Sequence, residues 1–177
     1  MSVRIVRAVA ADAVRVSAVA ALTFPLACPP DSPAADIEAH IASKLSPAAF
    51  EAYIAAADHV VLMADDGADS LAGYAMLVFG EPGDAETAAQ LTRRPTGELS
   101  KIYVDPAHHG AGVARALMDA ALAEASARGL AGLWLGTNEE NARAQRFYEK
   151  SGFARIGTRT FQLATRAEND FIFERAV

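Results

Sequence analysis

The order of strand-like and helix-like patterns across residues 97–153 is the feature that most limits how this chain can fold. The run ELSKIYV predicts a strand, DPAHH a turn, and residues 110–128 a helix rich in alanine. GLAGLWLGT predicts a further strand, and a second helix begins with Asn138 as its expected N-cap and ends at Ser151-Gly152. Strands that alternate with helices in this way indicate an α/β fold with a mixed sheet.

The first half of the chain supplies further elements. Val3, Ile5 and Arg7 alternate with their neighbours as a short strand, and residues 10–21 predict a helix. The four prolines of residues 24–33 indicate a loop, because proline lacks the amide that a helix needs.

Two shorter helices are expected next, over residues 34–44 and from Ser46-Pro47 onward. HVVLMAD and SLAGYAMLVFG then predict a hairpin of two strands, and residues 81–97 form a polar insertion. The runs FARIGTRTFQLAT and NDFIFERAV predict two strands at the end of the chain.

Composition limits the class of protein. A chain of 177 residues, of which 52% are hydrophobic, fits a single domain over residues 1–177. A net charge of −6 argues against nucleic acid as a partner. Cys28 is the only cysteine, which excludes an internal disulfide. Arginines interrupt the N-terminal stretch and no run approaches the ~18–20 apolar residues of a membrane span, so we expect a cytoplasmic protein without a membrane partner.

The stretch HHGAGVA, residues 108–114, places two glycines where the predicted strand gives way to the helix. A helix start leaves about four N–H groups without helical partners and carries a partial positive charge, so these bare amides could hold a pyrophosphate. The alternative is a tight turn in which glycine only permits close packing. Neither the Walker loop nor the dinucleotide fingerprint fits, because Val113-Ala114 follows Gly112 and Arg115 occupies the third glycine position.

A second cluster lies in NARAQRFYEKSGF, residues 141–153. Helical spacing puts Asn141, Ala144, Gln145 and Tyr148 on one face, with an amide at one end and a phenol at the other. Taken singly, Tyr148 also fits a core aromatic and Asn141 part of a helix cap.

Together the two clusters resemble the GCN5-related N-acetyltransferases. That family's turn has the form Gln/Arg-x-x-Gly-x-Gly/Ala, which this chain matches at Gly112 and Ala114 and leaves at His109. The resemblance implies a central sheet of about seven strands flanked by helices and splayed between the fourth and fifth strands. It also implies acetyl-coenzyme A as co-substrate and a primary amine, such as a polyamine or a peptide or protein amine, as acceptor.

The resemblance further implies residue roles. The turn amides would hold the pyrophosphate, the strand IYV would pair with the pantetheine arm, Asn141 would contact pantetheine, and Tyr148 would lie near the sulfur. The expected cofactor-binding residues are Ile102, Tyr103, Val104, His109, Gly110, Ala111, Gly112, Val113, Ala114, Asn141, Ala144 and Tyr148.

Acetyl transfer to an amine needs a base, support for the oxyanion and an acid for the thiolate. Glu98 is the candidate base. Strand alternation would place it on the side of Ser100, Ile102 and Val104 unless a bulge intervenes, and an exposed strand-start charge is the alternative. The Val104 amide is the expected oxyanion donor by resemblance, and Tyr148 the acid.

Adjacent residues at a turn rarely converge on one ion, so we expect no metal at His108-His109 and a phosphate contact for His109. Cys28 has no histidine near it in sequence, which favours direct transfer in a ternary complex. The alternatives are a non-catalytic acyl-coenzyme A sensor or regulatory module and a nucleotide-binding domain. Self-association into a homodimer is left open.

Overall fold

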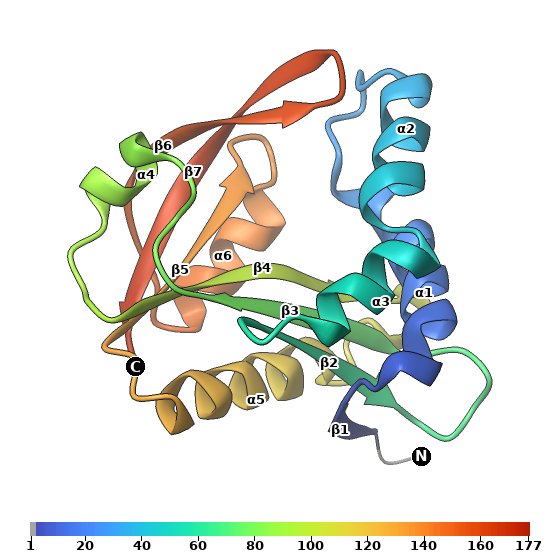
Figure 1. Cartoon of the computed structure of the whole chain (residues 1–177). Coiled ribbons are helices and arrows are strands. Elements are labelled where there is room, and N and C mark those ends of the chain that lie inside the picture. Colours follow the sequence, from blue (N-terminus) through green and yellow to red (C-terminus); the bar gives the residue numbers. More distant parts are fainter. Residues whose placement is uncertain (1–2) are drawn as a thin grey trace.

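The computed structural model describes residues 3–177 and places seven strands in one sheet, in the order β1-β2-β3-β4-β5-β7-β6 (Figure 1). All neighbouring strands pair antiparallel except β4 and β5, which are parallel. The predicted mixed sheet of seven strands is therefore confirmed. The strands are β1 (Arg4–Arg7), β2 (His59–Asp65), β3 (Gly73–Phe79), β4 (Thr96–Val104), β5 (Gly132–Asn138), β6 (Ala154–Leu163) and β7 (Arg166–Ala176).

Helices cover both faces of this sheet (Figure 1). Alternation along β2 sends Leu62 and Ala64 to the core beneath α5, and Val61 and Met63 to the core that holds Phe50 of α3. The helices are α1 (Ala13–Ala27), α2 (Ala34–Lys44), α3 (Pro47–Ala55), α4 (Ala85–Gln90), α5 (Val113–Ala127) and α6 (Ala142–Lys150).

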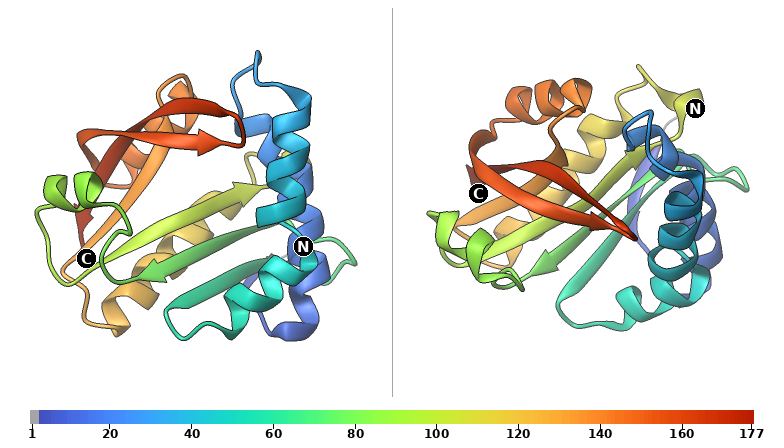
Figure 2. Two further views of the ribbon diagram at one scale, coloured as in Figure 1. Left: turned by 45° about the horizontal axis from the view of Figure 1, so that its top comes forward. Right: turned by 90° about the horizontal axis from the view of Figure 1, so that it is seen from above.

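The two halves of the sheet separate between β4 and β5. The parallel pairing joins only residues 96–98 of β4 to residues 132–134 of β5. Beyond Glu98 the strands diverge, while β4 continues to pair with β3 as far as Val104. The splay between the fourth and fifth strands is thus where it was predicted. On the far side, the β6–β7 hairpin reaches across to α2, where Thr165 Oγ1 donates to Asp36 Oδ2 at 2.7 Å (Figure 2).

The expected loop over residues 24–33 was wrong at its start. Helix α1 continues through Pro25 to Ala27. Pro25 removes one N–H from the helix within its last turn, where the cost is a single hydrogen bond and the chain can still close the turn with a bond from Cys28 N to Pro25 O at 3.3 Å. The helix therefore includes Phe24, which is buried, and Ala27, which is half-buried.

Three other boundaries differ from expectation. The polar insertion contains α4, which Asp84 caps by accepting from Thr87 N at 2.7 Å. Helix α5 begins at Val113, because Gly110 and Gly112 adopt the left-handed conformation. Asn138 ends β5 instead of capping α6.

The cap of α6 is Asn141, whose Oδ1 accepts from Ala144 N at 3.1 Å. By length and composition alone, the helical stretch Ala10–Ala27 could cross a membrane. The core helix of a soluble protein and a signal sequence meet the same criterion, so this finding carries little weight.

Candidate active site

A cleft of about 770 Å³ opens where β4 and β5 separate. Its walls come from β4, the glycine turn, α5, β5 and α6 on one side, and from α1, α2, β6 and β7 on the other. The cleft gathers every predicted site residue except Ala111. Ala111 instead borders a second cavity behind the turn, and its N–H donates to His108 O at 3.3 Å.

The glycine turn presents free amide donors to the cleft. Gly110 and Gly112 have φ angles of 83° and 80°, which residues with a Cβ rarely adopt. Gly112 caps α5, and its carbonyl accepts from Ala116 N at 3.0 Å, so the N–H groups of Val113, Ala114 and Arg115 precede the first helical bond. No neighbouring atom lies within 4 Å of the position a Cβ would take on either glycine, so an anion has room to approach these donors.

The Val104 amide points into the gap between β4 and β5. The N–H of the next residue, Asp105, donates to Ala72 O at 2.9 Å on the β3 side. Hydrogen-bonding groups alternate in direction along a strand, so those of Val104 face the opposite side. Its carbonyl accordingly accepts from His109 Nε2 at 3.1 Å. The Val104 N–H is therefore a preformed donor inside the cleft.

Glu98 lines the cleft, but from the other face of β4 than strand alternation predicted. Leu99 pairs with Leu77 and Lys101 with Met76, so Ser100 is an extra residue that forms a bulge. The bulge reverses the alternation and puts Glu98 on the face of Lys101 and Tyr103. Burial raises the pKa of the Glu98 carboxyl, against the opposing effect of the Arg159 and Lys101 charges.

Tyr148 enters the cleft from α6. Its ring packs against Phe153 and Phe173 with centroids 6.2 Å apart in both cases. Burial raises the pKa of its phenol, and the charge of Asp170 raises it further. The phenol is therefore protonated at neutral pH. Ala144 and Asn141 line the cleft one and two turns before it, respectively.

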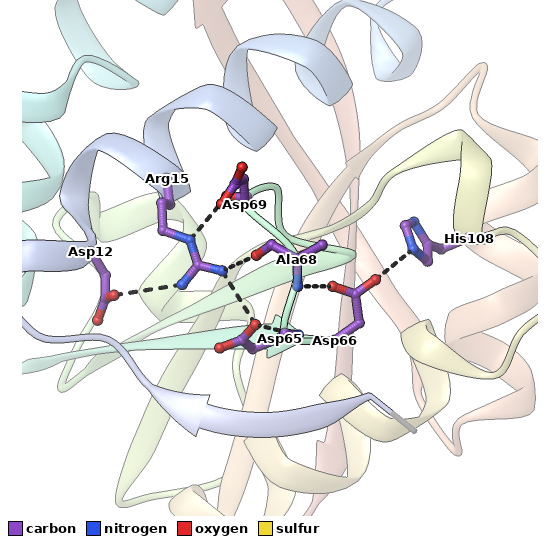
Figure 3. A network of polar contacts seen from close by, with 8 residues as sticks. Asp12, Arg15, Asp65, Asp66, Ala68, Asp69 and His108 are labelled. Atoms are coloured by element: carbon purple, nitrogen blue, oxygen red, sulfur yellow. Dashed lines mark hydrogen bonds and ion pairs between the residues drawn. The ribbon is translucent and has the colours of Figure 1, made fainter. Parts of the chain in front are cut away.

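The two histidines of the turn have separate partners. His108 Nε2 lies 3.3 Å from Asp66 Oδ2 in a network that ties the β2–β3 loop to the glycine turn and, through Asp65, to Arg15 of α1 (Figure 3). His109 contacts the Val104 carbonyl. Within residues 3–177, no three His, Cys, Asp or Glu side chains are grouped so that they could hold a metal ion.

The far wall of the cleft contains residues that the sequence analysis did not single out. Phe24 stacks on His40 with centroids 4.3 Å apart, and Phe161 meets the same imidazole edge-on at 6.0 Å. Burial and the charges of Lys101 and Lys44 lower the pKa of His40 to about 4, so it is neutral at neutral pH. These residues carry no local pattern, and only the fold brings them together.

Arg159 and Asp170 complete the far wall. They lie beside Glu98, and both come from the two C-terminal strands. On the opposite wall, Arg115 of α5 and Arg143 of α6 also line the cleft and were not predicted.

Comparison with known proteins identifies the family to which this architecture belongs. A family model described as "Acetyltransferase (GNAT) family" matches residues 27–153. The chain belongs to the GNAT family of acetyltransferases. The matched range includes the glycine turn, β4 and α6, which together form one wall of the cleft in this GNAT protein.

Relatives and solved structures agree with the family. An uncharacterized N-acetyltransferase of Mycobacterium tuberculosis is 44% identical over 165 residues, which cover 93% of this chain and 97% of the relative. A mycothiol acetyltransferase of Streptosporangium roseum is 48% identical over 61 residues, which cover 34% of this GNAT chain and 18% of that protein. The PaiA N-acetyltransferase of Thermoplasma acidophilum, solved with coenzyme A, has the same fold with a TM-score of 0.75, at 21% identity and with both chains covered completely.

Proposed function

We propose that this GNAT enzyme transfers the acetyl group of acetyl-coenzyme A to a primary amine by direct attack in a ternary complex, within a single domain over residues 1–177. The observation that carries the proposal is the meeting of a free-amide turn, a half-buried carboxyl and a protonated phenol in one cleft. The acceptor is a small-molecule amine or a peptide or protein amine.

The cofactor side of the cleft fits a phosphate-bearing thioester. The free amides of Val113–Arg115, with the positive end of α5, hold the pyrophosphate, and Arg115 and Arg143 add positive charge. Ile102, Tyr103 and Val104 offer the open edge of β4 to the pantetheine arm, with Asn141 and Ala144 of α6 opposite. His109 lies beside the same turn.

Acetyl-coenzyme A, when bound, supplies an acetyl thioester. Glu98 accepts the proton that the amine loses as its nitrogen bonds to the carbonyl carbon. The Val104 N–H stabilises the oxyanion. Tyr148 donates its proton to the thiolate as the C–S bond breaks. Both side chains then return to their starting protonation states by exchange with solvent, and the products are an amide and a thiol.

Cys28 supports direct transfer rather than an acyl-enzyme. It lines the cleft, but burial and the charge of Glu168 raise the pKa of its thiol to about 11. The thiol is protonated at neutral pH and a poor nucleophile. Initial-rate kinetics should give intersecting lines, and Cys28→Ser should keep its turnover.

The experiment that tests the function measures thiol release from acetyl-coenzyme A over a panel of primary amines, with the parent protein and Glu98→Gln. We expect release with at least one amine, and loss of the acidic limb of the pH–rate profile in the variant. Cofactor binding without thiol release across the panel would point to a sensor module. Tight binding of a nucleotide that lacks pantetheine would point to a nucleotide-binding domain.

A further inference from the structure

Arg159 of β6 lies between two carboxylates in the cleft. Its Nε and Nη2 both approach Asp170 Oδ2 at 3.3 Å, and its Nη1 lies 3.7 Å from Glu98 Oε1. The contact to Asp170 is a hydrogen-bonded ion pair, whereas the contact to Glu98 is a charge contact only. The guanidinium is thus shared unequally, with Asp170 as its stronger partner.

The surrounding residues are shaped to receive this guanidinium. A Cβ on Gly136 of β5 would lie only 2.5 Å from Arg159 Nη2, so any other residue at that position would displace it. The guanidinium carbon lies 5.2 Å from the centre of the Trp134 ring, which favours a cation there. Two neighbouring positions of β5 therefore fix the place of one charge.

Asp170 is held rigidly on the other side. Its side chain is 7% exposed, and its backbone pairs with Arg159 on one flank and with Asn138 on the other. A buried carboxylate needs a compensating charge, which Arg159 provides. Any change at Asp170 alters how much of the guanidinium charge is available to Glu98.

Four charged groups, each from a different element or its cap, act on the ionisation of Glu98. Arg159 of β6 and Lys101 of β4 favour its ionised form, while Asp170 of β7 and Asp84, the cap of α4, disfavour it. Arg159 and Asp170 act on it with opposite sign and are bonded to each other. A change in either residue therefore alters the electrostatic effect of the pair on the ionisation of Glu98.

We propose that Arg159 and Asp170 are positioning residues that together set the pH at which Glu98 becomes able to accept a proton from the amine. The proposal rests on the role proposed above for Glu98. Asp170 withdraws part of the Arg159 charge, so Glu98 remains a stronger base than it would be beside a free guanidinium. Arg159 in turn keeps enough charge near Glu98 for it to ionise.

Substitution of the two partners should shift the acidic limb of the pH–rate profile in opposite directions. Arg159→Met removes the cation, and the limb should move up by about one pH unit. Asp170→Asn removes the repelling anion and frees Arg159 for Glu98, so the limb should move down by a similar amount. Arg159→Lys keeps the charge and should return the limb toward the parent value.

A direct titration separates this inference from the proposed function. The carboxyl carbon of Glu98, labelled with ¹³C and assigned by its loss in Glu98→Gln, can be followed by NMR in the protein without substrates. The same opposite shifts are expected there. The double variant Arg159→Met/Asp170→Asn should titrate near the parent value, and it leaves no lone charge buried.

The matched control is Arg15→Met, which breaks an arginine–carboxylate pair outside the cleft, with Asp65 at 3.2 Å, and should leave the Glu98 titration unchanged. Shifts in the same direction, or none, for the two single variants would overturn the inference. An acidic limb that persists in Glu98→Gln would instead overturn the base assignment alone, since the NMR titration would still report the pair. If Arg159→Met does not fold, Asp170→Asn, Arg159→Lys and the double variant decide the matter.

Discussion

At the scale of single residues, the phenol of Tyr148 makes a clear kinetic prediction. Its raised pKa keeps the proton in place across the neutral range, which suits an acid and does not suit a base. Tyr148→Phe removes the donor but keeps the ring and its packing. We expect turnover to fall about 100-fold, a typical value for loss of an acid, with little change in the dissociation constant of acetyl-coenzyme A measured by calorimetry.

The control for this variant is Tyr53→Phe, because the Tyr53 hydroxyl donates to Lys44 O at 3.1 Å outside the cleft. It should keep the parent's turnover. An unchanged turnover number in Tyr148→Phe would remove Tyr148 as the acid.

His40 predicts a pH dependence of stability. Its pKa is about 4 in the folded protein and near 6.5 in the unfolded chain, so the unfolded chain binds the proton between these values. The neutral imidazole therefore contributes to the free energy of unfolding, and this contribution is complete above pH 6.5 and is lost as the pH falls toward 4. His40→Phe keeps a flat ring between Phe24 and Phe161 and should not show that loss.

The measurement is urea unfolding of both proteins at several pH values from 4 to 7. The stability of the parent relative to His40→Phe should fall as the pH is lowered. A difference that is constant over this range would contradict a neutral, half-buried His40.

The sequence predicted some residues of the site and missed others. Glu98 was found by its place at a strand start, yet its side was wrong, because the bulge at Ser100 depends on the register with β3. Arg159 and Asp170 could not be predicted at all, since their role depends on contacts with β4 and β5 that only the folded sheet creates. The conformation of the turn was easier to predict, because Gly110 and Gly112 adopt backbone angles that glycine alone favours.

At the scale of elements, the glycine turn makes a prediction about stability and affinity. Gly112 has φ 80° at the start of α5, and Gly129 has φ 72° just after its end. Alanine at either position should cost about 1 kcal/mol of stability, because both need the left-handed conformation. Gly112→Ala should also weaken acetyl-coenzyme A binding about tenfold by tilting the free amides.

Gly129→Ala is the matched control, with the same backbone cost and no cleft contact. Unfolding free energies and calorimetric dissociation constants of both variants test the idea. Equal affinities in the two variants would show that the amides of the turn do not hold the cofactor.

Element boundaries were predictable where local chemistry decides them. Ser46 caps α3 by accepting from Ala49 N at 3.2 Å, as its place before Pro47 predicted. Pro25 led to the wrong helix end, because a proline in the last helical turn costs little stability when the rest of α1 packs on the sheet. Asn138 and Asn141 lie three residues apart, and the length of β5 decided which of them caps α6.

At the scale of the whole molecule, the mixed seven-stranded sheet and its splay followed from the resemblance and the alternation of patterns, whereas the strand order β5-β7-β6 was not predicted. The cleft did not follow from any one segment. Residues 96–98 alone join β4 to β5, while the β6–β7 hairpin and α1–α2 close the far side. A ligand in the cleft would contact both halves of the sheet, so its binding is coupled to the stability of the fold as a whole.

That coupling gives the last prediction. A ligand that binds only the folded state at 100 times its dissociation constant adds about 2.7 kcal/mol, which for a chain of this length raises the midpoint of thermal unfolding by about 5–10 °C. We expect this shift with acetyl-coenzyme A, because the proposed binding mode places its pyrophosphate on the turn and its pantetheine between β4 and α6. ADP carries the pyrophosphate but cannot bridge the two halves, so at the same concentration it should raise the midpoint far less. Equal shifts with both ligands would mean that the turn binds nucleotides without using the splay, and the proposed transfer reaction would lose its structural basis.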